Sequence, residues 1–319
     1  MEPAEDTSPS LPKGISVLVP VYRSAETLPD LVAQLQPVLE RTGKSFEVVL
    51  VNDGSPDRSW EVITELAASR PWLRGICLMR NYGQHNALLC GLRSACFDTV
   101  VTLDDDLQHP PEHIPLLLAK LEEGFDVVYG TPEEGRHGFV RDLLSVATKG
   151  ALSIAMGVPE ARHISAFRAL RTKLRAAFAA FDAPNLLLDV LLSWGTTRFG
   201  TVTVEHRERA RGKSGYTFMR LLNQAVLVLV GFSTAPLRLA SFLGGIAVIF
   251  GIGVQAYVLL RYVATGGSVP GFPFLASIVS IFAGVQLFVL GIMGEYLARI
   301  FHRTNNKPPY AIGDTTRSS

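Results

Sequence analysis

Three adjacent carboxylates, Asp104, Asp105 and Asp106, form the strongest chemical signal in the sequence, and Gln108 follows two positions later. Neighbouring carboxylates repel one another, so the triplet favours a bound hard cation such as Mg²⁺ or Mn²⁺, whose shell the oxygens of a diphosphate would complete. In an extended segment alternate side chains point the same way, which predicts that Asp104 and Asp106 act together. A solvated acidic turn is the alternative interpretation.

Further polar side chains follow the first two apolar runs of the chain. Asp53 lies in Asn-Asp-Gly-Ser, where a carboxylate could accept hydrogen bonds from the base or ribose of a nucleoside, although these residues also favour an ordinary turn. The first run ends at Pro20 and Tyr22, and Glu26 follows one helical turn later. These positions lie where strands end, which is where open α/β sheets bind ligands.

The elements that would position these residues alternate along the chain, as is typical of an α/β domain with a mostly parallel sheet. The predicted strands are 15–20, 46–52, 75–79, 99–103 and 126–129, and the predicted helices are 27–41, 59–69, 85–95 and 111–123. The strands are continuous runs of apolar residues, so helices should cover both faces of the sheet. Later expected elements are a basic amphipathic stretch at 136–156, a helix near 186–194 and a strand near 201–206.

Charge is distributed unevenly along the 319 residues, of which 18% are charged, against roughly 25% in typical soluble domains. Residues 221–297 hold only three charges, and two apolar segments of 24 residues lie there, 239–262 and 274–297. Each would span about 36 Å as a helix. The sequence therefore predicts a transmembrane hairpin, with a pair of hydrophobic core helices as the alternative.

Charge and composition also argue against several classes of protein. The net charge of +1 argues against nucleic-acid binding, and the 48% hydrophobic content argues against disorder. Cys77, Cys90 and Cys96 show no paired spacing, so we expect neither a disulfide framework nor a zinc site.

Basic residues flank both apolar segments, which predicts an integral inner or plasma membrane protein whose catalytic domain is cytoplasmic. Residues 1–13 form an acidic, Pro- and Ser-containing tail without the pattern of a secretory signal. The interrupted apolar stretch 216–238 predicts an interfacial element, and 299–319 predicts a cytoplasmic tail.

Five motifs occur in the order seen in glycosyltransferase family 2, and the chain resembles its membrane-anchored polyprenyl-phosphate branch from about residue 15 to residue 310. The motifs are Val-Pro-Val-Tyr at 19–22, Asn-Asp-Gly-Ser at 52–55, Arg-Asn-Tyr-Gly-Gln-His at 80–85, Asp-Asp-Asp-Leu-Gln at 104–108 with Pro-Pro-Glu at 110–112, and Gly-Lys-Ser-Gly-Tyr at 212–216. Ser-Thr-Ala-Pro-Leu-Arg at 233–238 and Gly-Ile-Met-Gly-Glu-Tyr-Leu at 291–297 narrow the resemblance to this branch.

The resemblance implies an α/β fold of the GT-A type, a Rossmann-like mixed and mostly parallel sheet, over 14–215, followed by juxtamembrane helices and the hairpin. It implies an inverting transferase that uses a nucleotide-diphosphate sugar as donor and a polyprenyl phosphate, such as undecaprenyl phosphate, as acceptor. The likeness along 80–85 and 137–149 favours a UDP-linked donor. Membrane lipids and a homotetramer are the other implied partners.

The resemblance also implies roles for individual residues. Asp104 and Asp106 become the metal and diphosphate motif, holding Mg²⁺ or Mn²⁺, and Gln108 stands close to the donor sugar or the acceptor phosphate. The nucleotide-sugar pocket takes Pro20, Tyr22, Glu26, Asp53, Asp104 and Asp105, with Asp53 at the nucleobase.

A lipid phosphate is mostly dianionic at neutral pH, since its second pKa is about 6, so positioning can suffice without a general base. Such an acceptor requires cations near the membrane surface. Arginine suits phosphate because its planar fork donates two hydrogen bonds at once. The candidates are Arg136, Arg141, Arg168, Arg211 and Lys213, with Ser145 one helical turn beyond Arg141. The resemblance favours Arg136 and Arg141, and surface charges facing anionic headgroups are the alternative.

The sequence departs from the family pattern at two places. Asp105 stands where relatives often carry Ala, and an acid that relatives have before Phe-Arg is replaced at His163 or Ala166. Arg80 and His85 are interpreted as residues that orient their loop.

Two other functions stay open. A processive family 2 polysaccharide synthase would need a base and commonly a Gln-x-x-Arg-Trp motif, which the sequence lacks. A catalytically inactive membrane scaffold is the second.

Overall fold

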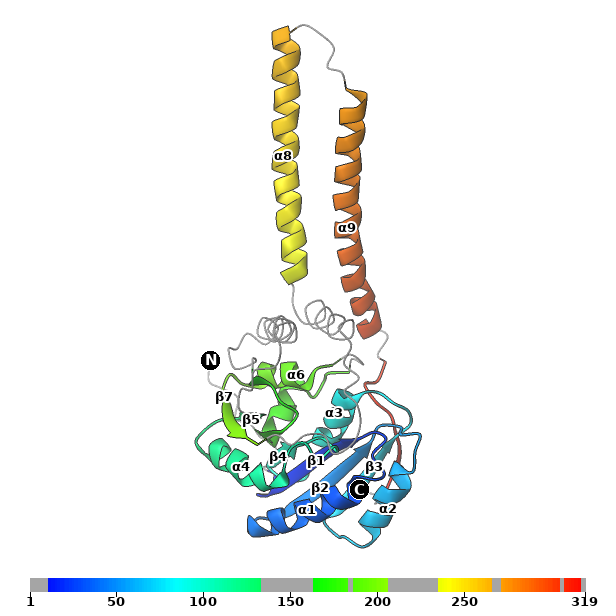
Figure 1. The fold of residues 1–319 in the computed structure, drawn as a ribbon, viewed down its shortest axis with the longest axis vertical. Helices are drawn as coiled ribbons and strands as arrows, with labels where there is room; N and C mark the ends of the chain where they lie inside the picture. The colour runs from blue at the N-terminus through cyan, green and yellow to red at the C-terminus, as the bar shows by residue number, and fades with distance from the viewer. Residues whose placement is uncertain are drawn as a thin grey trace. The chain divides into compact units, whose positions relative to one another are not determined.

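The computed structural model describes residues 11–132, 163–182, 186–205, 235–265, 271–304 and 307–316. The chain divides into two compact units, Met1–Leu221 with Asn306–Ser319, and Leu222–Asn305 (Figure 1). Each unit is described by itself below.

Within the described residues, a mixed sheet of eight strands forms the centre of the first unit, in the order β7-β5-β6-β4-β1-β2-β3-β8. The strands are β1 (Ile15–Val21), β2 (Phe46–Asn52), β3 (Leu73–Leu78), β4 (Thr99–Thr102), β5 (Val127–Pro132), β6 (Arg168–Arg171), β7 (Phe199–Val204) and β8 (Ile312–Thr315). The neighbours β4, β1, β2 and β3 are parallel, whereas β6 and β8 run antiparallel to the strands they pair with. The predicted α/β fold with a mostly parallel sheet is confirmed.

The helices follow the strands in the predicted alternation. They are α1 (Leu28–Arg41), α2 (Ser59–Ala68), α3 (Gln84–Ser94), α4 (Ile114–Glu122) and α6 (Leu188–Gly195), with 3-10 helices η1 (Pro111–His113) and η3 (Thr172–Phe178). Predicted and observed ends differ by up to three residues in the first 132 residues. Leu28, Leu31 and Leu35 form the buried stripe of α1, and Gly43, with φ +65°, follows its end in the left-handed conformation that glycine adopts freely.

Both faces of the central strand are covered, as the continuous apolar runs predict. Every residue of β1 is buried. Val17 and Val19 belong to the core cluster that includes Leu31 of α1 and other side chains of α1 and α4. Leu18 lies on the other face, where α3 packs so closely that a Cβ at Gly91 would lie 3.4 Å from its side chain. The sheet is therefore a rigid platform whose parallel strands end together at one rim.

The C-terminal residues correct one prediction. Residues 299–319 were predicted as a cytoplasmic tail without regular structure assigned to it, but α9 continues to Thr304 and β8 then pairs with β3 of the first unit. The Gly75 N–H donates to Thr316 Oγ1 at 2.9 Å, and the Met79 N–H donates to the Ala311 carbonyl at 2.9 Å. All four residues of β8 are exposed, so main-chain pairing holds the strand and no buried apolar pattern announces it in the sequence.

The second unit contains two long apolar helices, α8 (Ala235–Thr265) and α9 (Phe272–Thr304), yellow and orange in Figure 1. Among the described residues, one window, Ala240–Tyr257, is long and apolar enough to cross a membrane, and Phe282–Ala298 in α9 is a shorter apolar window. The helices confirm the two predicted apolar elements. Their insertion as a membrane hairpin stays a prediction, and most of the interfacial stretch 216–238 lies outside the described residues.

Candidate active site

The acidic triplet lies in a turn directly after β4, at the rim where the parallel strands end. Leu107 adopts φ +61°, a conformation that costs a residue with a Cβ of order 1 kcal/mol and that often marks a functional turn. The Gln108 N–H donates to Asp106 Oδ1 at 3.2 Å and closes the turn. The triplet is therefore not the extended segment that the alternation argument assumed, and that argument is wrong.

Two carboxylates of the turn contact different parts of the rim. Gln84, the first residue of α3, donates from Nε2 to Asp104 Oδ1 at 2.6 Å. Asp105 Oδ2 accepts hydrogen bonds from the Tyr22 N–H at 3.1 Å and from Ser24 Oγ at 2.5 Å. Burial raises the pKa of Asp105, and the hydrogen bonds from Ser24 and Tyr22 oppose this shift. Asp104 and Asp105 therefore bind different segments: Asp104 accepts from α3, and Asp105 accepts from the loop after β1.

Asp53 directly follows β2 at the same rim and is 3% exposed. Its Oδ1 accepts from the Tyr82 N–H at 2.7 Å and its Oδ2 from the Gly83 N–H at 2.8 Å. Burial raises its pKa, and these two hydrogen bonds oppose the rise. Gly54 is required beside it, because a Cβ there would lie 2.3 Å from the Arg80 carbonyl carbon. Asp53 therefore fixes the loop that leads into α3, whatever else it contacts.

The loop between β1 and α1 brings the remaining rim residues together. Pro20 is buried in β1, whereas Tyr22 is 43% exposed and Glu26 is exposed. The backbone N–H groups of residues 22–25 all donate to side chains of two other segments, the turn after β4 and the stretch from β2 to the first residue of α2. Their acceptors, in order, are Asp105, Ser55, Ser59 and Asp57. This network keeps Arg23 at φ +58° and presents Tyr22 at the rim.

Arg168 corrects the predicted set of phosphate-binding cations. It is 2% exposed, forms an ion pair with Asp189, and donates from Nε to Thr102 Oγ1 at 3.0 Å. Asp189 Oδ1 also accepts from the Tyr129 hydroxyl at 2.8 Å. Arg168 is the first residue of β6, which lies between β4 and β5, and its side chain is buried there rather than exposed to a phosphate. Arg168 is therefore part of a buried polar network behind the rim.

Comparisons with known proteins identify the family of this chain. The family model described as Glycosyl transferase family 2 matches residues 16–163. The chain is 36% identical over 305 residues to the undecaprenyl-phosphate 4-deoxy-4-formamido-L-arabinose transferase of Shewanella sediminis, covering 94% of this chain and 92% of that protein. The chain belongs to glycosyl transferase family 2. It is a glycosyltransferase of the polyprenyl-phosphate branch, as its motifs predicted.

Solved structures of another glycosyltransferase share the fold. Glucosyl-3-phosphoglycerate synthase from Mycobacterium tuberculosis, in complex with Mn²⁺, UDP-glucose and phosphoglyceric acid, matches with a TM-score of 0.53 and 20% identity over 69% of this chain and 79% of that one. Its complex with Mn²⁺, UDP and glucosyl-3-phosphoglycerate gives 0.51 and 20% identity over 68% and 78%. At this identity the match establishes the GT-A-like fold alone.

The carboxylates of this glycosyltransferase fit a metal ion whose coordination shell is completed by the substrate. Among the described residues, no group of three His, Cys, Asp or Glu side chains is arranged to hold an ion by itself. Asp105 is directed to the β1–α1 loop, which leaves Asp104 and Asp106 as the two carboxylates of the turn. One or two carboxylates, with substrate phosphates and waters, are the usual protein ligands of Mg²⁺.

Several predicted residues of the glycosyltransferase are not placed. Arg136, Arg141, Ser145, Arg211 and Lys213 lie outside the described residues. Of the two positions that replace the family acid, His163 is exposed, and the Ala166 carbonyl accepts a hydrogen bond from Thr102 at 2.6 Å. Gln84 and Asp189 were not predicted, although Gln84 lies inside the 80–85 motif.

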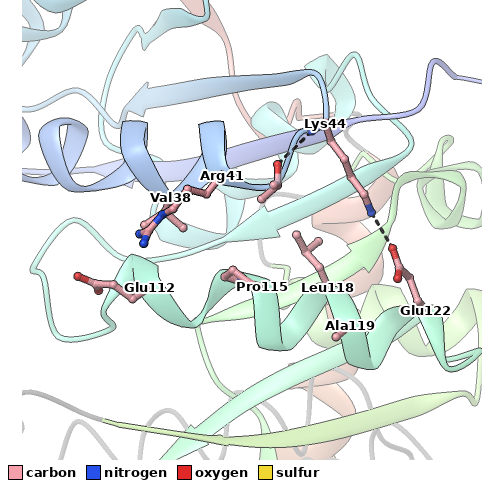
Figure 2. A pocket seen from close by; sticks show the side chains of 9 residues that line it. Val38, Arg41, Lys44, Glu112, Pro115, Leu118, Ala119 and Glu122 are labelled. Atoms are coloured by element: carbon pink, nitrogen blue, oxygen red, sulfur yellow. Dashed lines mark hydrogen bonds and ion pairs between the residues drawn. The ribbon is translucent and has the colours of Figure 1, made fainter.

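The groove drawn in Figure 2 is separate from the rim. It has a volume of about 450 Å³ and lies between α1 and α4, where Val38 and Arg41 face Pro115 and Leu118. The ion pair between Lys44 and Glu122, at 2.6 Å, crosses one end. None of its lining residues is a predicted site residue, so the groove is not the candidate active site.

His85 provides a pH-dependent test of the packing behind the rim. Its Nδ1 accepts from the Leu188 N–H at 3.4 Å. Burial lowers its pKa to about 4, Asp189 opposes this shift and Arg168 adds to it. Because unfolded His85 binds a proton that the folded state excludes, we expect stability to fall as pH drops from 6.5 towards 4, by up to about 3 kcal/mol.

The His85→Asn variant, whose Oδ1 can accept the same bond, should lose that part of the pH dependence. Urea unfolding at pH 7 and pH 4.5 measures it, with His163→Asn as the control. An unchanged difference in unfolding free energy between the two pH values in His85→Asn would contradict the prediction.

Proposed function

We propose that this glycosyltransferase moves a sugar from a UDP-sugar to undecaprenyl phosphate or a related polyprenyl phosphate, with inversion, at the cytoplasmic face of a membrane. The observation that carries the proposal is the 36% identity to an undecaprenyl-phosphate transferase over 94% of the chain. Because a match over 94% of the chain leaves out only about 6% of it, the shared part takes in most of the sheet and most of both apolar helices. Assembly as a tetramer stays a prediction.

Asp104 and Asp106 would hold Mg²⁺ or Mn²⁺ together with oxygens of the donor diphosphate. When bound, the cation neutralises the negative charge that grows on the leaving diphosphate. Mn²⁺ in the complexes of glucosyl-3-phosphoglycerate synthase supports this part of the proposal. The strained turn at Leu107 keeps the two carboxylates in place before the donor arrives.

The exposed ring of Tyr22 and the exposed Glu26 would contact the nucleoside, with buried Pro20 behind them. Both carboxylate oxygens of Asp53 accept backbone N–H groups, so Asp53 would contact the nucleobase only with its remaining lone pairs, and otherwise shapes the pocket through the loop at Tyr82 and Gly83. Gln108 would stand at the sugar or at the acceptor phosphate.

The acceptor phosphate is its own nucleophile, because it is mostly dianionic at neutral pH. The chain then needs cations to hold it, and we propose Arg136, Arg141, Arg211 and Lys213, with Ser145, for this role. Arg168 does not belong to this set, because its guanidinium is buried against Asp189. Helices α8 and α9 would hold the enzyme in the bilayer that contains the lipid.

The hydrogen bond from Gln84 to Asp104 gives a first test of the metal motif. Mutation of a group that orients a metal-ligating carboxylate typically lowers the affinity for the metal 10- to 100-fold. We therefore expect Gln84→Leu to weaken Mn²⁺ binding, measured by electron paramagnetic resonance in the presence of UDP, by about tenfold or more. Gln36→Leu is the matched control, since Gln36 donates to Glu40 at 2.9 Å on α1. Equal Mn²⁺ affinity in the two variants would contradict the prediction.

The function is tested by mass spectrometry of the polyprenyl-phosphate pool in cells with and without the protein. We expect a glycosylated polyprenyl phosphate that disappears with the gene and is re-formed by the purified enzyme from one UDP-sugar. A product chain extended on a sugar hydroxyl, with no change in the lipid pool, would instead indicate a polysaccharide synthase and overturn the proposal.

A further inference from the structure

Asp105 is the middle acid of the turn at residues 104–108, named the metal turn after its proposed ligands Asp104 and Asp106, and it contacts the loop that follows β1. Asp105 Oδ2 accepts from the Tyr22 N–H at 3.1 Å and from Ser24 Oγ at 2.5 Å. Asp104 and Asp106, in contrast, bond to Gln84 of α3 and to the Gln108 N–H within the turn. The Asp105 carboxylate therefore joins two segments that are 81 and 83 residues apart in the chain.

The loop that Asp105 holds has no regular secondary structure of its own. Its four successive N–H groups, at residues 22–25, donate to side chains, and Arg23 is held at φ +58°. Three of the acceptors, Ser55, Asp57 and Ser59, lie between β2 and the first residue of α2. Asp105 is the fourth, and it alone among these acceptors lies on the metal turn. Loss of its side chain would remove two hydrogen bonds between the loop and the turn, whereas the bonds to Ser55, Asp57 and Ser59 would remain.

We infer that Asp105 is a positioning residue that acts through Tyr22, fixing the nucleoside pocket at a set distance from the metal and diphosphate motif. The inference rests on the proposed function. The diphosphate and the nucleoside belong to one donor molecule, so an error in their spacing weakens binding even when each subsite is intact. Asp105 then needs no direct contact with the donor, which differs from the role that the family resemblance implied.

The chemistry of the Asp105 hydrogen bonds distinguishes a positioning role from direct contact with the cation or the donor. An amide oxygen can accept the same two hydrogen bonds as a carboxylate oxygen. Asn should therefore replace Asp105 with little loss, whereas a residue that ligates a cation or a charged donor group should not tolerate Asn.

The experiment measures the affinity of the full-length protein in detergent for UDP with saturating Mn²⁺, alongside the thermal midpoint. We expect Asp105→Ala to weaken UDP binding about tenfold and Asp105→Asn to stay within about threefold of wild type. Asp98→Ala is the matched control. Asp98 also accepts one N–H, from Gly14 at 2.9 Å, and one hydroxyl, from Thr99 at 3.5 Å, but at the opposite end of β1. It should lower the midpoint without changing UDP affinity.

Ser24→Ala removes only one of the two bonds and serves if Asp105→Ala does not fold; we expect it to weaken UDP binding about threefold. Equal losses in Asp105→Asn and Asp105→Ala would overturn the inference in favour of a direct ligand. Wild-type affinity in Asp105→Ala, or in Ser24→Ala if it alone folds, would overturn it as well. Wild-type protein that binds neither UDP nor GDP with Mn²⁺ would overturn the proposed function and this inference with it.

Discussion

Replacing Asp106 by Asn should reduce sugar transfer to lipid phosphate by about 1000-fold while the protein stays folded. The neutral amide cannot hold a divalent cation as a carboxylate does, so the charge on the leaving diphosphate is no longer neutralised. The fold should survive because an amide oxygen can still accept the Gln108 N–H that Asp106 Oδ1 accepts at 3.2 Å. Asp104→Asn should behave in the same way.

Transfer of radiolabelled sugar from UDP-sugar to undecaprenyl phosphate measures the loss, and the thermal midpoint reports the fold. Asp98→Asn provides the control, because Asp98 accepts a backbone N–H from Gly14 far from the turn. Full activity in either variant of the turn would rule out the metal assignment. Loss of the thermal transition in the Asn variants, but not in Asp98→Asn, would show that the turn is structural instead.

The rim could be predicted because its geometry follows from parallel strands alone. Apolar runs fixed β1, β2 and β4, and acids or turn residues directly after each run had to converge at the carboxyl ends of the strands. Asp53 and Asp104 lie there as expected. The contacts within the rim could not be predicted, because the bonds of Gln84 and Asp105 depend on loops that take positive φ at Arg23, Gly83 and Leu107.

Two strands, β6 and β8, could not be predicted from the sequence, for different physical reasons. β8 is short and exposed, so only its pairing with β3 defines it. β6 begins with Arg168, and an arginine in a short segment reads as a surface residue unless its partner is known. That partner, Asp189, is 21 residues further on and belongs to α6. An ion pair between residues that only the folded chain brings together cannot be predicted from local periodicity.

Removing one partner of that pair should destabilise the catalytic unit strongly. Asp189→Leu leaves the Arg168 guanidinium, 2% exposed, without its counter-charge, and it also leaves the Tyr129 hydroxyl without an acceptor. Burial and the Asp189 carboxylate raise the pKa of Tyr129 well above its ordinary value, so the hydroxyl stays a donor. Loss of one member of a buried ion pair costs about 3–5 kcal/mol, and we expect the unfolding free energy to fall by that amount.

Tryptophan fluorescence during denaturant unfolding follows this unit, because Trp60, Trp72 and Trp194 all lie in it. The double variant Arg168→Met with Asp189→Leu should recover most of the loss, since it removes the uncompensated charge and fills the same space. Asp182→Ala is the control: Asp182 is exposed, lies 3.6 Å from Arg93, and should change stability by less than about 1 kcal/mol. A double variant less stable than Asp189→Leu would show that Arg168 contributes through Thr102 rather than through the pair. Because Thr102 precedes Asp104 by two residues, that outcome would also tie the buried network directly to the metal turn.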